Sequence, residues 1–147
     1  MNHPTPTDAP PRTPLAWVVV ESFGYGHAAA PLADVTVDTR ASLRNPHHDP
    51  AMRFLTGLDE SVRRHVMTTA GAAGLAAHLT LLAVGMVADL DDIRQRQVRV
   101  AIGCVGGRHR SVALAEEVTA RLRTLGVPAE VSHRDITKPV LTKGQHR

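Results

Sequence analysis

The chain has 147 residues and a formal net charge of +3, from 17 Lys and Arg against 14 Asp and Glu. This length suits a single domain with a full hydrophobic core, and the mild basic charge suits an anionic partner without requiring one. The lone cysteine, Cys104, excludes an internal disulfide and favours a reducing, cytoplasmic setting.

The first segments of the chain are a polar lead and two predicted strands. Residues 1–14, MNHPTPTDAPPRTP, lack the apolar core of a signal peptide and are predicted to be disordered. Strands are predicted at Leu15–Val20 and Asp34–Asp38. Three polar clusters accompany these strands: SFGYGH at 22–27, DTR at 38–40 and NPHHDP at 45–50.

Two helices are predicted next, over Asp59–Thr69 and Leu75–Ile93. Residues 70–88 are apolar enough to raise the question of a membrane span. Alanine and glycine make up much of this run and His78 interrupts it, so we expect a buried helix and no membrane association.

The region over residues 98–125 carries the strongest chemical signal. A β-branched run predicts a strand over Val98–Cys104, and Ser111–Leu125 has the pattern of a helix, so GCVGGRHR forms the turn between them. Glycines in this turn let backbone N–H groups point inward, and the helix that follows adds the positive end of its dipole. The turn also carries three basic side chains, Arg108, His109 and Arg110. Together, the amides, the helix end and a guanidinium predict a site for a phosphate-like anion.

A last strand is predicted over Ala129–His133, with the polar cluster SHRDI at 132–136 and a flexible basic tail over 138–147. Strands that alternate with helices predict an α/β fold, a single domain with a mostly parallel sheet and helices on both faces. Ligands of such sheets bind at the carboxyl ends of the strands, where the polar clusters lie.

The spacing of Cys104, Arg110 and Ser111 leaves a catalytic alternative open. It matches the C-x5-R pattern of cysteine-dependent phosphatases, in which a thiolate lies at the base of an amide-lined loop and the arginine holds the phosphoryl group. The histidine that usually precedes the nucleophile is Gly103 here. The other interpretation makes Cys104 a small buried residue that ends the strand. A Walker-type ATPase is not expected, because G-x-x-x-x-G-K-[ST] has no match.

Six motifs, in order, resemble the C-terminal domain of the RNase adapter protein RapZ family. They are SFGYG, DTR, NPHHDP, TGLD, AIGCVGGRHRSVALAE and HRDI, between residues 22 and 136. The resemblance implies an α/β domain, residues 15–137 here, that binds a phosphorylated metabolite, which is glucosamine-6-phosphate in the best-understood members. It also implies contact with small regulatory RNA and assembly into homo-oligomers. Full-length relatives carry an N-terminal P-loop domain, so we expect this chain to be the C-terminal part standing alone.

The resemblance places a phosphate pocket on the glycine-rich turn, with His47 approaching from another strand end. The residues that it implies for ligand binding are Arg40, His47, Val105, Gly106, Gly107, Arg108, His109 and Arg110, supported by Asp38 and Asn45. The chain departs from the family at several points: Val105 replaces a threonine and Arg108 replaces a lysine. One extra residue lies in the segment 41–44, and the lysine that follows SFG in the family has no counterpart at 25–27. Asp38 and Arg40 lie two residues apart and have the alternative of pairing with each other.

The functional interpretation is a binding domain without chemistry of its own, a sensor or adapter whose ligand is an amino-sugar phosphate or a nucleotide. The alternatives are a phosphohydrolase that uses Cys104 and Arg110, and an RNA-binding regulator that uses Arg134, Lys138 and Lys143. The basic tail has a low charge density and no aromatic platform, so weak or absent RNA binding is expected. No metal or cofactor is expected, because the adjacent side chains of His47 and His48 point to opposite faces of an extended segment.

Overall fold

The sheet of this protein has four parallel strands. The computed structural model describes residues 17–88 and 97–142. The strands are β1 (Val18–Gly24), β2 (Val35–Asp38), β3 (Val98–Cys104) and β4 (Ala129–His133), in the spatial order β2-β3-β1-β4. Every neighbouring pair of strands is parallel, which confirms the predicted α/β fold in a single domain.

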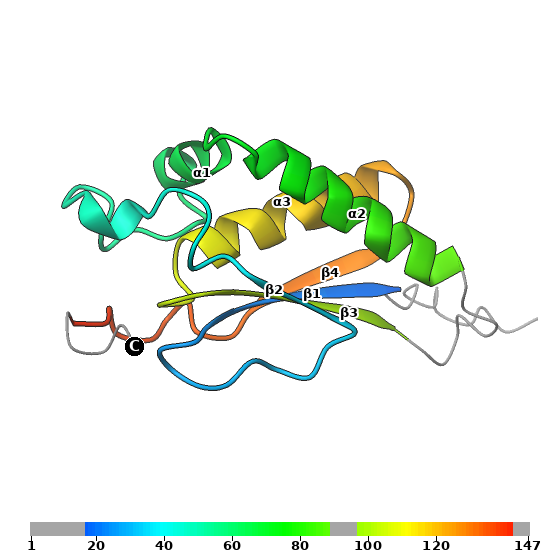
Figure 1. Cartoon of the computed structure of the whole chain (residues 1–147), viewed down its shortest axis with the longest axis horizontal. Helices are drawn as coiled ribbons and strands as arrows, with labels where there is room; N and C mark the ends of the chain where they lie inside the picture. The colour runs from blue at the N-terminus through cyan, green and yellow to red at the C-terminus, as the bar shows by residue number, and fades with distance from the viewer. Residues whose placement is uncertain (1–16, 89–96, 143–147) are drawn as a thin grey trace, which may run out of the picture.

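Three helices cover one face of this sheet (Figure 1). They are α1 (Glu60–Met67), α2 (Ala72–Ala88) and α3 (Arg110–Thr124). The crossovers from β2 to β3 and from β3 to β4 run in the same direction across the sheet, so right-handed connections place their helices on one side. The crossover from β1 to β2 runs the opposite way, and residues 25–34 make it as a loop on the other face. The expectation of helices on both faces is therefore corrected, since all the helices described lie on one.

The hydrophobic core lies between the sheet and the three helices. Alternate residues of the central strands point toward the helices, among them Val18, Val20 and Ile102, all of them fully buried. The helices contribute Ala76, Leu79, Ala83, Leu114, Val118 and Leu122. These small aliphatic side chains leave little space to spare, so the core holds α3 and the turn before it at a fixed position on the sheet.

Helix α2 is largely apolar and carries no Asp, Glu, Lys or Arg. One side of this helix, which includes Ala76 and Ala83, packs into the core. No single helix in the described part of the chain is long and apolar enough to cross a membrane; α1 and α2 reach that length only together, and they are bent by 90°.

Most element boundaries lie close to the predicted ones, with two differences. β1 runs on to Gly24 instead of ending at Val20, so the SFG motif is part of a strand. A short 3-10 helix, η1 (Pro46–His48), forms inside the NPHHDP motif. The predicted helix end at Ile93 and the polar lead over residues 1–14 lie outside the described residues.

The carboxyl ends of the strands meet at one edge of the sheet, and the polar motifs gather there as predicted. The turn between β3 and α3, residues 105–109, lies at this edge and is called the β3–α3 loop below. Residues 39–59 follow β2 along the same edge. The chain returns there after β4, where Leu141 is buried against the loop.

Candidate functional site

The β3–α3 loop packs directly against the end of β1. Gly107 has φ +65, and a Cβ at this position would lie 2.6 Å from the amide nitrogen of Gly24. A Cβ on Gly24 would in turn lie 2.5 Å from the carbonyl carbon of Gly106. The two backbones therefore touch at a distance that only glycine allows. Tyr25 N–H adds a hydrogen bond to the carbonyl of Cys104 (2.9 Å), which fixes where the loop begins.

Backbone donors of the loop are available to a ligand. Gly107 N–H points to the Sγ of Cys104 (3.3 Å). Among the described residues, the amides of Gly106, Arg108 and His109 donate to no other group. No side chain caps the N-terminus of α3 at His109. The loop thus presents N–H groups and a helix end, the groups that bind anions in many proteins.

Arg110 is predominantly a structural residue. Its side chain is buried, and one terminal nitrogen donates to the backbone carbonyls of Thr39 (3.1 Å), Arg40 (2.9 Å) and Ser42 (3.4 Å). Burial lowers the pKa of its guanidinium, which still stays protonated at neutral pH. Arg110 therefore joins the start of α3 to the segment after β2, and its positive charge lies beside the loop.

Arg108 is a second structural residue, whose side chain is hydrogen-bonded within the protein. Its guanidinium donates to the carbonyls of Phe54 (2.6 Å), Leu55 (2.9 Å) and Ile136 (3.1 Å). Its own carbonyl accepts a hydrogen bond from Gly57 N–H (2.9 Å). One residue of the loop thus holds two distant segments in place, and its guanidinium is engaged with the protein itself.

His109 is a neutral residue of the site. Its Nε2 lies 3.2 Å from the carbonyl of Met52, and its side chain is buried. Burial lowers its pKa to about 4, so the imidazole carries no charge at neutral pH. The expectation of a charged partner at this position is not met, and His109 contributes a hydrogen bond that secures residue 52.

Asp38 and Arg40 form an ion pair with each other. The Nε of Arg40 lies 3.0 Å from both carboxylate oxygens, and a terminal nitrogen lies 2.7 Å from Oδ2. The hydrogen bond from Arg40 lowers the pKa of Asp38. The guanidinium also lies 4.0 Å above the ring centre of Tyr25. Asp38 and Arg40 are therefore paired with each other, which was the alternative that the sequence left open. Arg40 also lines an open cleft beside the loop.

An open cleft of about 1060 Å³ lies beside the β3–α3 loop. A small recess of about 30 Å³ adjoins it and shares several walls. The cleft is lined by Arg40, Ala41, Leu43, Asn45, His47, His48, Arg53, Phe54, Val105, Arg110, Val140, Leu141 and Thr142. The recess adds Gly106, Arg108, His109 and Pro139. All these residues lie in the described part of the chain, and none of them is an Asp or a Glu, so the cleft is suited to an anion.

The cleft and the recess together contain most of the predicted ligand-binding residues, and other residues line them as well. Asp38 and Gly107 line neither the cleft nor the recess, although both contact residues that do. Asn45 accepts a hydrogen bond from His47 N–H (3.2 Å) and so orients η1 at the cleft wall. Sequence reasoning missed Arg53, Phe54 and residues 140–142. The neighbours of Phe54, which include Ala51, Met52, Leu55 and Leu58, are apolar as well, so residue type alone did not single out Phe54.

Cys104 lies beneath the loop. Its side chain is 3% exposed, its Sγ lies 3.1 Å from the Oγ of Ser111, and it lines neither the cleft nor the recess. The described residues contain no group of three or more His, Cys, Asp or Glu arranged to hold a metal ion. The geometry places the thiol out of reach of a ligand in the cleft.

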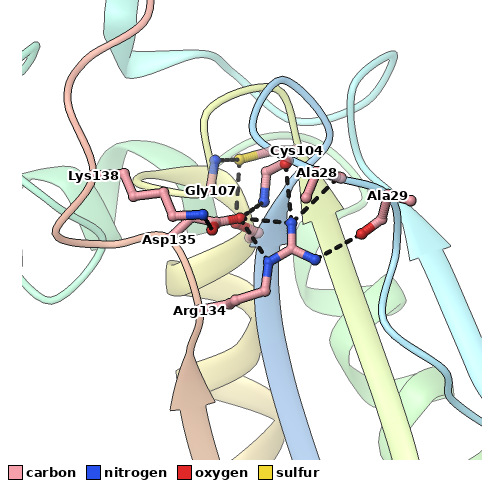
Figure 2. A network of polar contacts seen from close by, with 9 residues as sticks. Ala28, Ala29, Cys104, Gly107, Arg134, Asp135 and Lys138 are labelled. Carbon is pink, nitrogen blue, oxygen red and sulfur yellow. Dashed lines mark hydrogen bonds and ion pairs between the residues drawn. The ribbon is translucent and has the colours of Figure 1, made fainter.

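The HRD motif forms a polar network behind the loop (Figure 2). The buried Asp135 accepts hydrogen bonds from Gly24 N–H (2.8 Å) and from Arg134, and it forms an ion pair with Lys138 (2.7 Å). Burial opposes ionisation of Asp135, but these hydrogen bonds outweigh it and lower its pKa to about 2. Arg134 also donates to the carbonyl of Ala29 (2.6 Å). Two of the predicted RNA contacts, Arg134 and Lys138, are thus engaged internally, and Lys143 lies outside the described residues.

Comparisons with known proteins agree on one family. The model of the RapZ C-terminal domain matches residues 16–137 of the chain. Curated relatives named nucleotide-binding proteins come from Thermobifida fusca (41% identical over 117 residues), Salinispora tropica (42% over 119) and Alkalilimnicola ehrlichii (37% over 121). These matches cover 80%, 81% and 82% of this chain but only 40%, 39% and 42% of the relatives. The chain therefore spans about two fifths of the length of the curated relatives it matches.

Proposed function

Because this chain belongs to the RapZ C-terminal domain family, we propose that it is a binding domain for a small phosphorylated metabolite. The phosphate lies on the β3–α3 loop, and the remainder of the ligand extends into the adjoining cleft. The domain acts as a sensor or adapter and carries out no chemistry on its ligand. Amino-sugar phosphates and nucleotides are the two ligand classes to be compared, the second being the class named for the curated relatives.

One observation carries the proposal: unused amides of the loop open beside a cleft whose walls hold cations and no carboxylate. Gly106 and His109 supply N–H groups that have no partner among the described residues. Arg40, Arg53 and Arg110 line the cleft next to them. A phosphate monoester is stabilised by both kinds of group.

The wall of the cleft supports the role of a sensor. It is built from the end of β2, from η1 and the residues after it, from the β3–α3 loop and from residues 140–142. A ligand that contacts several of these segments binds the arrangement in which they are assembled, so binding stabilises that arrangement over others.

Thermal unfolding in the presence of phosphorylated compounds tests the proposal. We expect inorganic phosphate, glucosamine 6-phosphate or AMP at millimolar concentration to raise the melting temperature of the full chain. The variant Gly106→Asp places a negative charge at the recess, where an added Cβ meets no atom within 4 Å, so it folds but repels the anion. We expect the ligand-induced rise in melting temperature to disappear.

A matched control is Gly74→Asp. Gly74 lies on α2, where an added Cβ also meets no atom within 4 Å, and it lines no part of the cleft. This variant should retain the ligand-induced shift. The proposal fails if no phosphorylated compound stabilises the wild type, or if both glycine variants respond to ligand like the wild type.

A further inference from the structure

The chain after β4 forms one wall of the recess beside the β3–α3 loop. Residues 139–142 have no regular secondary structure and run past the carboxyl edge of the sheet (Figure 1). Pro139, Val140 and Leu141 line the recess, and Val140 and Leu141 also line the cleft. Residues 139–142 are called the strap below.

The recess is too small for the phosphate that the proposed function places on the loop. Its volume is about 30 Å³, which holds about one or two water molecules. A phosphate carries several oxygen atoms, each about the size of a water molecule, so it needs more space than the recess has. Gly106 and His109, whose amides have no partner among the described residues, line this recess and not the larger cleft. An anion therefore reaches these amides only when a wall of the recess moves.

Two walls of the recess are held in place by hydrogen bonds. On the side of the β3–α3 loop, the buried Arg110 donates to three backbone carbonyls of the segment after β2. On the side of η1, Asn45 accepts a hydrogen bond from His47 N–H (3.2 Å), and Arg53 donates to the carbonyl of His47 (3.2 Å). Displacing either wall breaks these hydrogen bonds, which opposes its movement.

The strap is held by fewer polar contacts. The hydrogen bond that precedes it runs from Lys138 N–H to the carbonyl of Asp135 (3.0 Å), and Pro139 has no N–H to donate. Neither Val140 nor Leu141 makes a hydrogen bond with another residue in the described part of the chain. Leu141 is attached through its side chain, which is 8% exposed and lies against the recess. The strap is therefore the wall that can move, with its hinge after Lys138.

We infer that the strap is a lid over the anion site, held shut by the side chain of Leu141, and that an anion bound to the β3–α3 loop displaces it. The inference rests on the proposed function, because that function places the anion where the strap now closes the recess. A closed lid weakens the apparent affinity for the anion in proportion to the fraction of molecules in which the lid is open. Each binding event in turn moves the strap, so its position depends on whether the site is occupied.

Isothermal titration of the full chain with inorganic phosphate tests whether the lid competes with the anion. Leu141→Ala removes the side chain that holds the lid shut, so we expect this variant to bind phosphate about tenfold more tightly than the wild type. The matched control is Leu75→Ala, at a partly buried position of α2 that lines neither the cleft nor the recess. Its affinity for phosphate should equal that of the wild type.

Methyl NMR spectra of the wild type measure the position of the lid directly. The methyl resonances of Leu141 are identified by their absence from the spectrum of Leu141→Ala, and those of Leu75 by their absence from that of Leu75→Ala. We expect phosphate to shift the Leu141 resonances toward the values of a solvent-exposed leucine. The Leu75 resonances should stay where they are.

The inference is overturned if Leu141→Ala binds phosphate no more tightly than the wild type, or if the Leu141 resonances do not move when phosphate is bound. The proposed function stands in both cases, since the wild type still binds phosphate. Binding seen in Leu141→Ala alone would support a lid that is closed in nearly every wild-type molecule. If neither protein binds phosphate or any phosphorylated compound, the inference and the proposed function fail together.

Discussion

Two walls of the same cleft use their polar side chains in opposite ways. On the β3–α3 side, Arg108, His109 and Arg110 direct their side chains to backbone carbonyls of neighbouring segments. On the facing side, residues 45–54 leave side chains such as Phe54 in the open cleft. The loop that carries the chemical signature thus holds the surrounding segments together, while a segment with a weaker signature supplies much of the surface that is open to the cleft. A basic residue in a motif is therefore not by itself a ligand contact.

The first prediction, which has the largest expected effect, compares an arginine of each kind, one bonded within the protein and one at the edge of the cleft. Arg110→Ala removes three charged hydrogen bonds and takes this donor away from the carbonyl of the buried Thr39, so we expect the free energy of unfolding to fall by about 3 kcal/mol. Arg40→Ala removes an ion pair between half-exposed side chains, which solvent screens, and should cost much less. Urea unfolding followed by circular dichroism measures both. Equal losses of stability in the two variants would contradict the distinction between Arg110, a buried structural residue, and Arg40, an exposed residue at the edge of the cleft.

The second prediction concerns the buried imidazole of His109. Its pKa is lowered to about 4 from an ordinary 6.5, so the unfolded chain binds a proton in that interval and the folded chain does not. The stabilising contribution is complete above pH 6.5 and is lost as the pH falls toward 4. We expect a loss of about 2 kcal/mol between pH 7 and pH 5.

Urea unfolding at pH 7, 6 and 5 measures this loss. His109→Gln cannot titrate and should flatten the dependence, while His78→Gln, at an exposed position of α2, should leave it as in the wild type. A pH dependence that persists in His109→Gln would assign it to another group.

The third prediction compares neighbouring glycines of the β3–α3 loop. Gly107→Ala brings a Cβ within 2.6 Å of the backbone of Gly24 at φ +65, and we expect a loss of about 1–2 kcal/mol. Gly106→Ala adds a Cβ that meets no atom within 4 Å and should change stability by less than about 0.5 kcal/mol. Thermal melts of the two variants give the comparison. A melting temperature of Gly107→Ala equal to that of Gly106→Ala would show that the close contact with β1 is not required.

The elements of the fold were predictable because their signals are local. The β-branched run of β3 and the pattern of α3 identify both elements from short stretches of sequence, and the glycine-rich turn between them follows. The face of the sheet on which each helix lies was harder to predict from the sequence, because it depends on the order of the strands. The connection after β1 carries no helix, and Pro31 inside it was the local signal against one.

The site was predictable in its location and less so in its details. Residue type and spacing indicate a cluster at the strand ends, but they do not say which backbone carbonyls come within reach of an arginine. The acceptors of Arg108 lie 53 and 28 positions away in the chain, at Leu55 and Ile136. Phe54 was missed for a similar reason, because its place in the cleft depends on that long-range contact.

The hydrogen bonds of Arg108 also bear on how the protein opens. One planar group ties together residues that are 53 and 28 positions from it, and so it closes two long loops, as a crosslink would. Fluctuations that detach this guanidinium release the Phe54 segment and the chain after β4 in the same event. Amide hydrogens of these two segments should then exchange with solvent at a common rate, as one cooperative unit of local unfolding.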